Sequence, residues 1–155
     1  MAELKKGDRA PSFRLPDQNE HIVRLSDYRG RHLLIYVYPK AGTPGCTKQA
    51  CSVRDNLSKL TRMGVAAVGV SPDKSNAQKK FDQKHALGFP LLCDPQHATI
   101  NAYGAWGRKS MHGKKYMGVV RCAFLIDPSG HIAGAWYKVN PIDTASKAME
   151  ALKQR

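Results

Sequence analysis

One stretch of the chain, between residues 32 and 51, restricts the possible folds more than any other. It begins with the apolar run HLLIYVY at residues 32–38, which is typical of a buried strand. Residues 39–45 then include two prolines, two glycines and a threonine, and a helical periodicity continues from Ala50 to Met63. Cys46 therefore falls at a strand-to-helix junction, where first-turn N–H groups lack intrahelical acceptors and the helix dipole is positive. Because a thiolate is stabilised in such a position, we expect Cys46 to be reactive.

The rest of the chain predicts a mixed sheet flanked by helices. Residues 13–15 and 22–25 alternate around a polar turn, which indicates an N-terminal hairpin. Residues 104–118 are polar and interrupted by glycines, which predicts a loop. We expect a βαβ unit followed by a hairpin and a terminal helix, all within a single domain over residues 1–155. The other expected strands are 65–70, 90–93, 119–126 and 131–137, and the other expected helices are 75–85, 98–103 and 140–153.

Composition argues against several classes of protein. No apolar run approaches the roughly 18 residues of a membrane span, and the N-terminus lacks an apolar signal core, so we expect a cytoplasmic protein. The formal charge of +13 is spread along the chain without a long basic block, which favours a solvated surface over nucleic-acid binding. In a reducing compartment the four cysteines indicate catalysis or burial, and the scattered histidines argue against a zinc site.

Cys51 follows Cys46 by five positions, and this spacing restricts how the two thiols can react. On a continuous helix, residues five apart are rotated by about 140° and separated by about 7.5 Å along the axis. A disulfide needs Cα atoms within about 7 Å and converging Cβ bonds. The two thiols can therefore bond only if the first turns of the helix unwind. The spacing also differs from the shorter Cys-x-x-Cys pair of dithiol oxidoreductases.

The residues around Cys46 resemble the active-site pattern of peroxiredoxins, Pro39-x-x-x-Thr43-x-x-Cys46. The longer string YPKAGTPGCTKQAC, from Tyr38 to Cys51, is similar to the bacterioferritin-comigratory-protein, or peroxiredoxin Q, branch. Further matching segments are GD at 7–8, SPDK at 71–74, WG at 106–107 and FLID at 124–127. The resemblance implies an α/β, thioredoxin-like fold: a central mixed β-sheet flanked by helices, with an added N-terminal β-hairpin.

The resemblance also implies a role for each residue of the pattern. Cys46 would be the peroxidatic cysteine, whose thiolate attacks a peroxide oxygen and becomes a sulfenic acid. Thr43 would hydrogen-bond the thiolate and the peroxide, and Pro39 would shield the pocket from water. The N–H groups of Gly45 and Cys46 would hold the peroxide oxygens. Arg121 would stabilise the thiolate and the charge on the departing oxygen.

By the same resemblance, Cys51 would be the resolving cysteine and would close a Cys46–Cys51 intramolecular disulfide. Thioredoxin or a glutaredoxin-like donor would reduce it, the substrates would be hydrogen peroxide and organic hydroperoxides, and no metal or other cofactor would be needed. The branch implies a monomer without a specific nucleic-acid or membrane partner. Gln49 would lie near the site and orient it. We interpret Cys93 and Cys122 as buried core residues, although a resolving role for Cys93 stays open.

Two other functions are compatible with the sequence. A thiol–disulfide oxidoreductase acting on proteins would use the same reactive cysteine, and peroxide consumption with a thioredoxin system distinguishes it from a peroxidase. A basic nucleic-acid-binding or holdase protein would account for the charge of +13. It would bind nucleic acid in a salt-sensitive way that survives the loss of Cys46.

Overall fold

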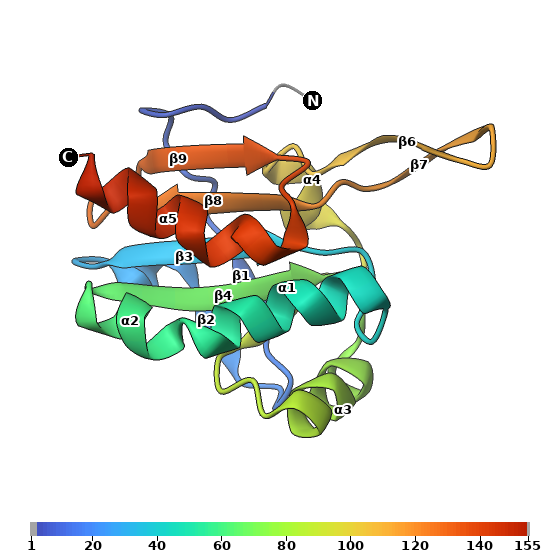
Figure 1. The fold of residues 1–155 in the computed structure, drawn as a ribbon, viewed down its shortest axis with the longest axis horizontal. Helices are drawn as coiled ribbons and strands as arrows, with labels where there is room; N and C mark the ends of the chain where they lie inside the picture. Colours follow the sequence, from blue (N-terminus) through green and yellow to red (C-terminus); the bar gives the residue numbers. More distant parts are fainter. Residues whose placement is uncertain (1–2, 155) are drawn as a thin grey trace.

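A computed structural model describes residues 3–154, and its centre is a five-stranded mixed sheet (Figure 1). The parallel strands β3, β4 and β5 are joined through helices, whereas β8 runs antiparallel to β3 and β9 antiparallel to β8. The mixed sheet predicted from the order of the elements is therefore confirmed. The strands lie in the order β5 (Leu91–Cys93), β4 (Val65–Ser71), β3 (His32–Val37), β8 (Cys122–Ile126) and β9 (Ile132–Tyr137).

Helices cover one face of this sheet, and the N-terminal hairpin with a short helix covers the other. Side chains alternate along β3, so that residues 34, 36 and 38 face one core cluster and residues 33, 35 and 37 face the second. The first cluster is closed by α1 (Pro44–Asp55), α2 (Leu57–Arg62), α3 (Ser75–His85) and α5 (Thr144–Lys153). The second is closed by β1 (Arg14–Pro16), β2 (Ile22–Arg24), the 3-10 turn η1 (Leu25–Tyr28) and α4 (Ala98–Ala102). None of the helices within residues 3–154 is long and apolar enough to cross a membrane.

The segment 104–118 is a β-hairpin, so the predicted loop is wrong. Strands β6 (Trp106–Met111) and β7 (Lys114–Val119) pair in antiparallel register and project from the body of the molecule (Figure 1). The connecting residues His112 and Gly113 have φ values of +52° and +79°. Positive φ at both central residues is the geometry of a type I′ turn, which matches the twist of the paired strands.

Three other predicted elements have different bounds. The expected strand 119–126 is interrupted, because β7 ends at Val119 and β8 begins at Cys122, which places Arg121 just before the strand. The helix expected from Ala50 begins earlier, at Pro44, and Asn56 separates α1 from α2. The terminal helix starts with the 3-10 turn η2 (Pro141–Asp143) before α5.

The N-terminal segment covers the beginning of β9 along its outer edge. The Gly7 N–H donates to the Ile132 carbonyl at 2.9 Å, and the Ile132 N–H donates to the Asp8 carbonyl at 2.8 Å. Arg9 forms an antiparallel bridge with His131. These bonds satisfy backbone groups that β8, on the other side of β9, does not reach.

Candidate active site

Cys46 lies in the first turn of α1, just beyond the end of β3, and is 1% exposed. Thr43 is the N-cap residue, and Pro44 follows at the start of the helix, where a missing N–H costs no hydrogen bond. Gly42 has a φ of +86°, a left-handed conformation that glycine adopts without strain as the chain turns into α1. The N–H groups of Gly45 and Cys46 come next, where the helix offers no acceptor. The turn therefore presents free donors beside a buried sulfur.

Arg121 directs its positive charge at this sulfur. Its Nη2 donates to Cys46 Sγ at 3.5 Å. A Cβ atom at position 45 would lie 3.0 Å from Nη2, so Gly45 leaves room for the guanidinium. Within residues 3–154 the ion pairs are Lys5–Asp8 and Arg54–Asp55, so Arg121 has no carboxylate partner there. The guanidinium is thus available to a thiolate, and contacts of this charged kind are among the stronger hydrogen bonds.

A chain of hydrogen bonds holds the guanidinium in place. Arg121 Nη1 donates to Gln49 Oε1 at 2.6 Å, and Gln49 Nε2 donates to Thr144 Oγ1 at 3.0 Å. Thr144 Oγ1 in turn donates to the Pro141 carbonyl at 3.2 Å. Gln49 and Thr144 are fully buried. These hydrogen bonds connect η2 and the start of α5 to α1 through Gln49.

The Thr43 side chain is directed at the loop rather than at the sulfur. Its Oγ1 donates to the Lys40 carbonyl at 2.8 Å, and no side-chain cap bond is formed at the helix start. The Thr43 carbonyl accepts the Thr47 N–H and hydroxyl at 2.9 and 2.8 Å. Asp73, in the segment that follows β4, accepts the Ala41 N–H on its Oδ2 at 2.7 Å and fixes the same loop. With its proton donated to Lys40, the Thr43 hydroxyl can still accept a hydrogen bond from a bound molecule.

A cavity of about 570 Å³ opens beside Arg121. Pro39 and Arg121 line it together with residues that sequence reasoning did not identify. Burial lowers the pKa of Lys109 in this wall, and the nearby Arg121 charge lowers it further, against the opposing effect of Cys46. The hairpin thus brings cations close to Cys46. The remaining lining residues are Arg108, Ser110, Lys115, Val120, Lys138 and Val139.

All four cysteines are free thiols in the structure. Cys51 lies on α1 with Cys46 and is partly exposed, so the two thiols share one continuous helix, the arrangement in which a disulfide is excluded. Burial raises the pKa of Cys122 to about 12 and that of Cys93 to about 11. Cys122 Sγ also donates to the Val120 carbonyl at 3.1 Å. These surroundings are those of structural cysteines, because a raised pKa keeps both thiols protonated and a nucleophile needs a thiolate.

Two stacked tyrosines from β3 lie in the same core cluster as Cys46, with ring centroids 5.4 Å apart. Tyr38 donates its hydroxyl to Gln78 Oε1 at 2.6 Å. The Tyr36 hydroxyl is buried and has no hydrogen-bond partner within the described part of the chain. Burial raises the pKa of both tyrosines well above the usual value. Gly69 makes this packing possible, because a Cβ atom there would lie 3.0 Å from the Tyr36 hydroxyl.

The fold and the site define a sheet-and-helix protein with a buried, arginine-contacted cysteine at a helix N-terminus. The model of the AhpC/TSA family matches residues 6–135. Peroxiredoxin Bcp of Escherichia coli K12 is 48% identical over 132 residues, which are 85% of each chain. The chain therefore belongs to the AhpC/TSA family, and the relatives that it matches there are peroxiredoxins of the Bcp and Q type.

Solved structures of such relatives share the whole architecture. Peroxidoxin BcpB of Mycobacterium tuberculosis is similar at a TM-score of 0.86 and 32% identity, covering 98% of both chains. The bacterioferritin comigratory protein of Xanthomonas campestris, described for its alkyl peroxide reduction activity, has a TM-score of 0.85 and 32% identity over 92% of this chain and 90% of that one. The thioredoxin-like fold expected from the sequence is confirmed. Within residues 3–154, no group of three or more His, Cys, Asp or Glu side chains is arranged to hold a metal ion.

Proposed function

We propose that this protein is a thiol-dependent peroxidase that reduces hydrogen peroxide and organic hydroperoxides. The observation that carries the proposal is the 3.5 Å contact between Arg121 Nη2 and Cys46 Sγ at the first turn of α1. The Xanthomonas campestris relative described for alkyl peroxide reduction supports organic hydroperoxides as substrates. The cavity is lined by Arg121 and not by Cys46, so we expect the peroxide to reach the sulfur past the guanidinium, and the apolar residues Val120 and Val139 suit an alkyl group.

In the first step the Cys46 thiolate attacks the terminal oxygen of the peroxide. An S–O bond forms, the O–O bond breaks, and the leaving oxygen takes a proton to become water or an alcohol. The sulfur loses two electrons and becomes a sulfenic acid. The N–H groups of Gly45 and Cys46 hold the peroxide oxygens, and Thr43 Oγ1 accepts a hydrogen bond from the peroxide O–H group. Arg121 stabilises the developing negative charge, while Pro39 limits access of water.

In the second step the Cys51 thiolate attacks the Cys46 sulfur. The S–O bond breaks, hydroxide leaves with a proton as water, and a Cys46–Cys51 disulfide forms. Because both residues lie on α1, the helix must unwind before the sulfurs meet. A dithiol donor, thioredoxin or a glutaredoxin-like protein, then reduces the disulfide by exchange. We propose that the enzyme works as a monomer in the reducing cytoplasm, without a nucleic-acid or membrane partner.

The test is peroxide consumption coupled to thioredoxin, thioredoxin reductase and NADPH. Cys46→Ser should consume no peroxide, whereas Cys51→Ser should react once and stop as a sulfenic acid that dimedone traps. Cys93→Ser, which removes a buried thiol outside the proposed cycle, is the matched control and should turn over like the wild type. The proposal fails if the wild type consumes no peroxide or if Cys46→Ser retains full activity.

Mass mapping after one equivalent of peroxide identifies the resolving thiol. We expect a peptide in which Cys46 and Cys51 are joined. A disulfide from Cys46 to Cys93 would leave the peroxidase assignment intact and would move the resolving role to Cys93. A protein that exchanged disulfides with other proteins, but left peroxide unchanged, would instead be a thiol–disulfide oxidoreductase.

A further inference from the structure

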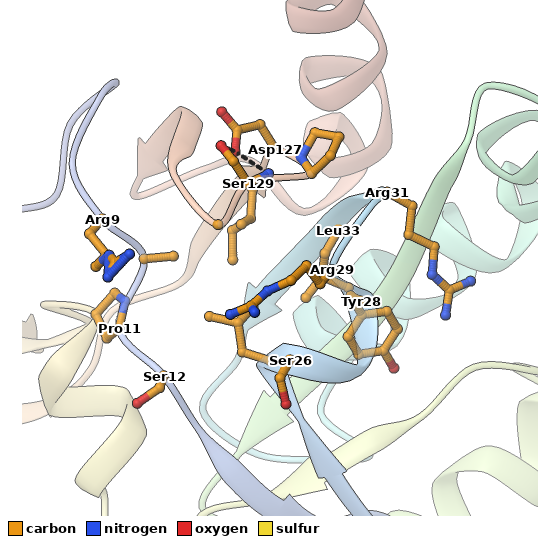
Figure 2. Close-up of a pocket in the computed structure, with 15 residues that line it drawn as sticks. Arg9, Pro11, Ser12, Ser26, Tyr28, Arg29, Arg31, Leu33, Asp127 and Ser129 are labelled. Carbon is orange, nitrogen blue, oxygen red and sulfur yellow. Dashed lines mark hydrogen bonds between the residues drawn. The ribbon is translucent and has the colours of Figure 1, made fainter.

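A second cavity, of about 440 Å³, lies at the opposite end of β3 from Cys46 (Figure 2). Its walls come from the N-terminal segment, from η1 and the start of β3, and from the turn between β8 and β9. None of the residues proposed for the peroxidase reaction lines it. The proposed catalytic chemistry therefore gives no account of this cavity.

Three arginines line the cavity: Arg9, Arg29 and Arg31. In Figure 2 the Arg29 side chain extends across the cavity toward the side where Arg9 lies, whereas Arg31 points away from both. Arg31 instead lies over the Tyr28 ring, with its Cζ 5.0 Å from the ring centroid. Across residues 3–154, none of these three arginines belongs to an ion pair. Two exposed guanidinium groups are thus directed into one cavity without a neutralising partner.

The one carboxylate among the lining residues, Asp127, accepts hydrogen bonds within its own turn. Its Oδ1 accepts the Ser129 N–H and hydroxyl at 3.0 and 2.9 Å, and the His131 N–H at 2.9 Å. Figure 2 shows Asp127 turned toward Ser129 within its own turn. Within residues 3–154 Asp127 forms no ion pair with Arg9 or Arg29, so both guanidinium groups remain available to a ligand.

The remaining surface of the cavity is suited to a small organic molecule. Pro11, Leu25 and Pro128 are partly exposed and supply apolar contacts, and Ser12 and Ser26 also line the wall. Small-molecule sites typically have volumes of about 300–1,000 Å³ and combine an apolar lining with a few polar groups. The cavity falls in this range and exceeds what an inorganic anion alone requires.

We propose that this pocket binds a phosphate monoester of about mononucleotide size. A phosphate monoester carries a charge of roughly −2 at neutral pH, which two guanidinium groups balance, and guanidinium matches phosphate oxygens in paired hydrogen bonds. The phosphate lies between Arg9 and Arg29, and the organic part contacts Pro11 and Leu25, which are partly exposed in the wall. A monocarboxylate would leave one of the two guanidinium groups without a counter-charge.

The test is calorimetric titration of the reduced full-length protein with adenosine monophosphate, inorganic phosphate and adenosine. We expect adenosine monophosphate to bind, inorganic phosphate to bind more weakly, and adenosine not to bind. Arg9→Gln and Arg29→Gln should each weaken adenosine monophosphate binding by about tenfold or more. Arg62→Gln, at an exposed position on α2 outside the cavity, makes the same charge change and should alter binding by less than about twofold.

Two further measurements locate the ligand. Amide chemical shifts should move at Ser26 and Ser129 and stay unchanged around Cys46. Cys46→Ser should bind adenosine monophosphate like the wild type, so that a failed peroxidase assay and a failed binding assay remain distinguishable. The proposal is overturned if neither phosphate probe binds at millimolar concentration. Equal weakening by Arg62→Gln and Arg29→Gln would also overturn it, because that result indicates diffuse attraction to a chain of charge +13.

Discussion

The Arg121 guanidinium donates to two acceptors at once, and its planar shape makes this possible. Nη2 contacts Cys46 Sγ at 3.5 Å while Nη1 donates to Gln49 Oε1 at 2.6 Å. The planar guanidinium presents its donors in a fixed fork, so the bond to Gln49 fixes the direction of the other donor. A lysine ammonium carries the same charge on a single flexible nitrogen and lacks this geometry.

Arg121→Lys should therefore reduce the second-order rate constant for peroxide by about tenfold or more, although the charge is conserved. Stopped-flow measurement of the first oxidation under excess reductant gives this constant directly. Arg108→Lys changes an arginine that lines the same cavity without a bond to the sulfur, and it should alter the rate by less than about twofold. A wild-type rate in Arg121→Lys would show that the forked geometry is not required.

The two stacked tyrosines of β3 differ in one respect that affects stability. The Tyr38 hydroxyl is bonded to Gln78, whereas the Tyr36 hydroxyl has no partner within residues 3–154. A buried hydroxyl without a partner loses its hydration and gains nothing in return, a cost of about 1–3 kcal/mol.

Tyr36→Phe should accordingly raise the free energy of unfolding of the reduced protein by about 1 kcal/mol. Tyr38→Phe should lower it by about 1–2 kcal/mol, because Gln78 Oε1 then loses its donor. Urea denaturation of the two variants beside the wild type measures both changes. If Tyr36→Phe were destabilised as much as Tyr38→Phe, the Tyr36 hydroxyl would have a partner that the structure does not show.

Residues of the candidate site that lie close together along the chain could be identified from the sequence. Contacts between residues that are distant along the chain could not. Pro39, Thr43 and Cys46 form one local pattern, and the structure places them in one loop and the helix start that follows it. The bond from Gln49 to Thr144 joins positions 95 apart, and no periodicity predicts a contact at that distance. Thr144 was missed for this reason.

Among the elements, α1 has two requirements that conflict. In the proposed cycle its first turn must be intact to present free N–H groups beside Cys46, yet the proposed disulfide with Cys51 needs that turn to open. The first turn has no side-chain cap at Thr43 and no acidic residue to complement the helix dipole. The sequence therefore leaves the start of α1 with little local stabilisation.

Oxidation to the disulfide should expose the amides of residues 44–51 to hydrogen exchange. We expect their protection to fall by about tenfold or more, while β4 and α5 stay protected. Mass spectrometry of the reduced and the disulfide forms measures the change. Cys51→Ser, oxidised in the same way, cannot form the disulfide and should keep the protection of the reduced wild type. Unchanged protection in the disulfide form would show that α1 does not unwind.

The β6–β7 hairpin explains the largest error in the predicted elements. Asn-Gly and Asp-Gly are the strong sequence signals of a two-residue turn, whereas this turn is His112–Gly113, with His112 at a φ of +52°. The strands carry a high proportion of Lys and Gly, which are depleted in strands, so their composition resembled a loop. Sequence pattern thus gave no warning that cations of this hairpin line the cavity beside Arg121.

For the molecule as a whole, buried thiol and phenol groups lower the free energy of unfolding at alkaline pH. Burial raises the pKa of Cys122 from 9.0 to about 12. Between pH 9.0 and about 12, the Cys122 thiol loses its proton in the unfolded chain but keeps it in the folded chain. This group therefore leaves the free energy of unfolding unchanged below pH 9.0 and lowers it as the pH rises toward about 12. The buried tyrosines, whose pKa values are also raised, contribute in the same direction.

Cys122→Ala should therefore reduce the decline of unfolding free energy between pH 9.0 and about 12, even though the lost sulfur lowers stability at neutral pH. Urea unfolding of reduced protein at intervals across this range measures the slope. Lys153→Ala, at an exposed position near the end of α5, is a control that should leave the slope close to that of the wild type. An identical slope in Cys122→Ala would mean that the thiol does not contribute to this decline.

The bonds between the N-terminal segment and the start of β9 also have a consequence for solubility. They occupy the outer side of an edge strand, and an open strand edge is a template for pairing with another chain. Removal of residues 1–9 would release the Ile132 N–H and carbonyl and lengthen the open edge of β9. The shortened protein should form aggregates that bind thioflavin T on mild heating, at temperatures where the intact chain stays dispersed.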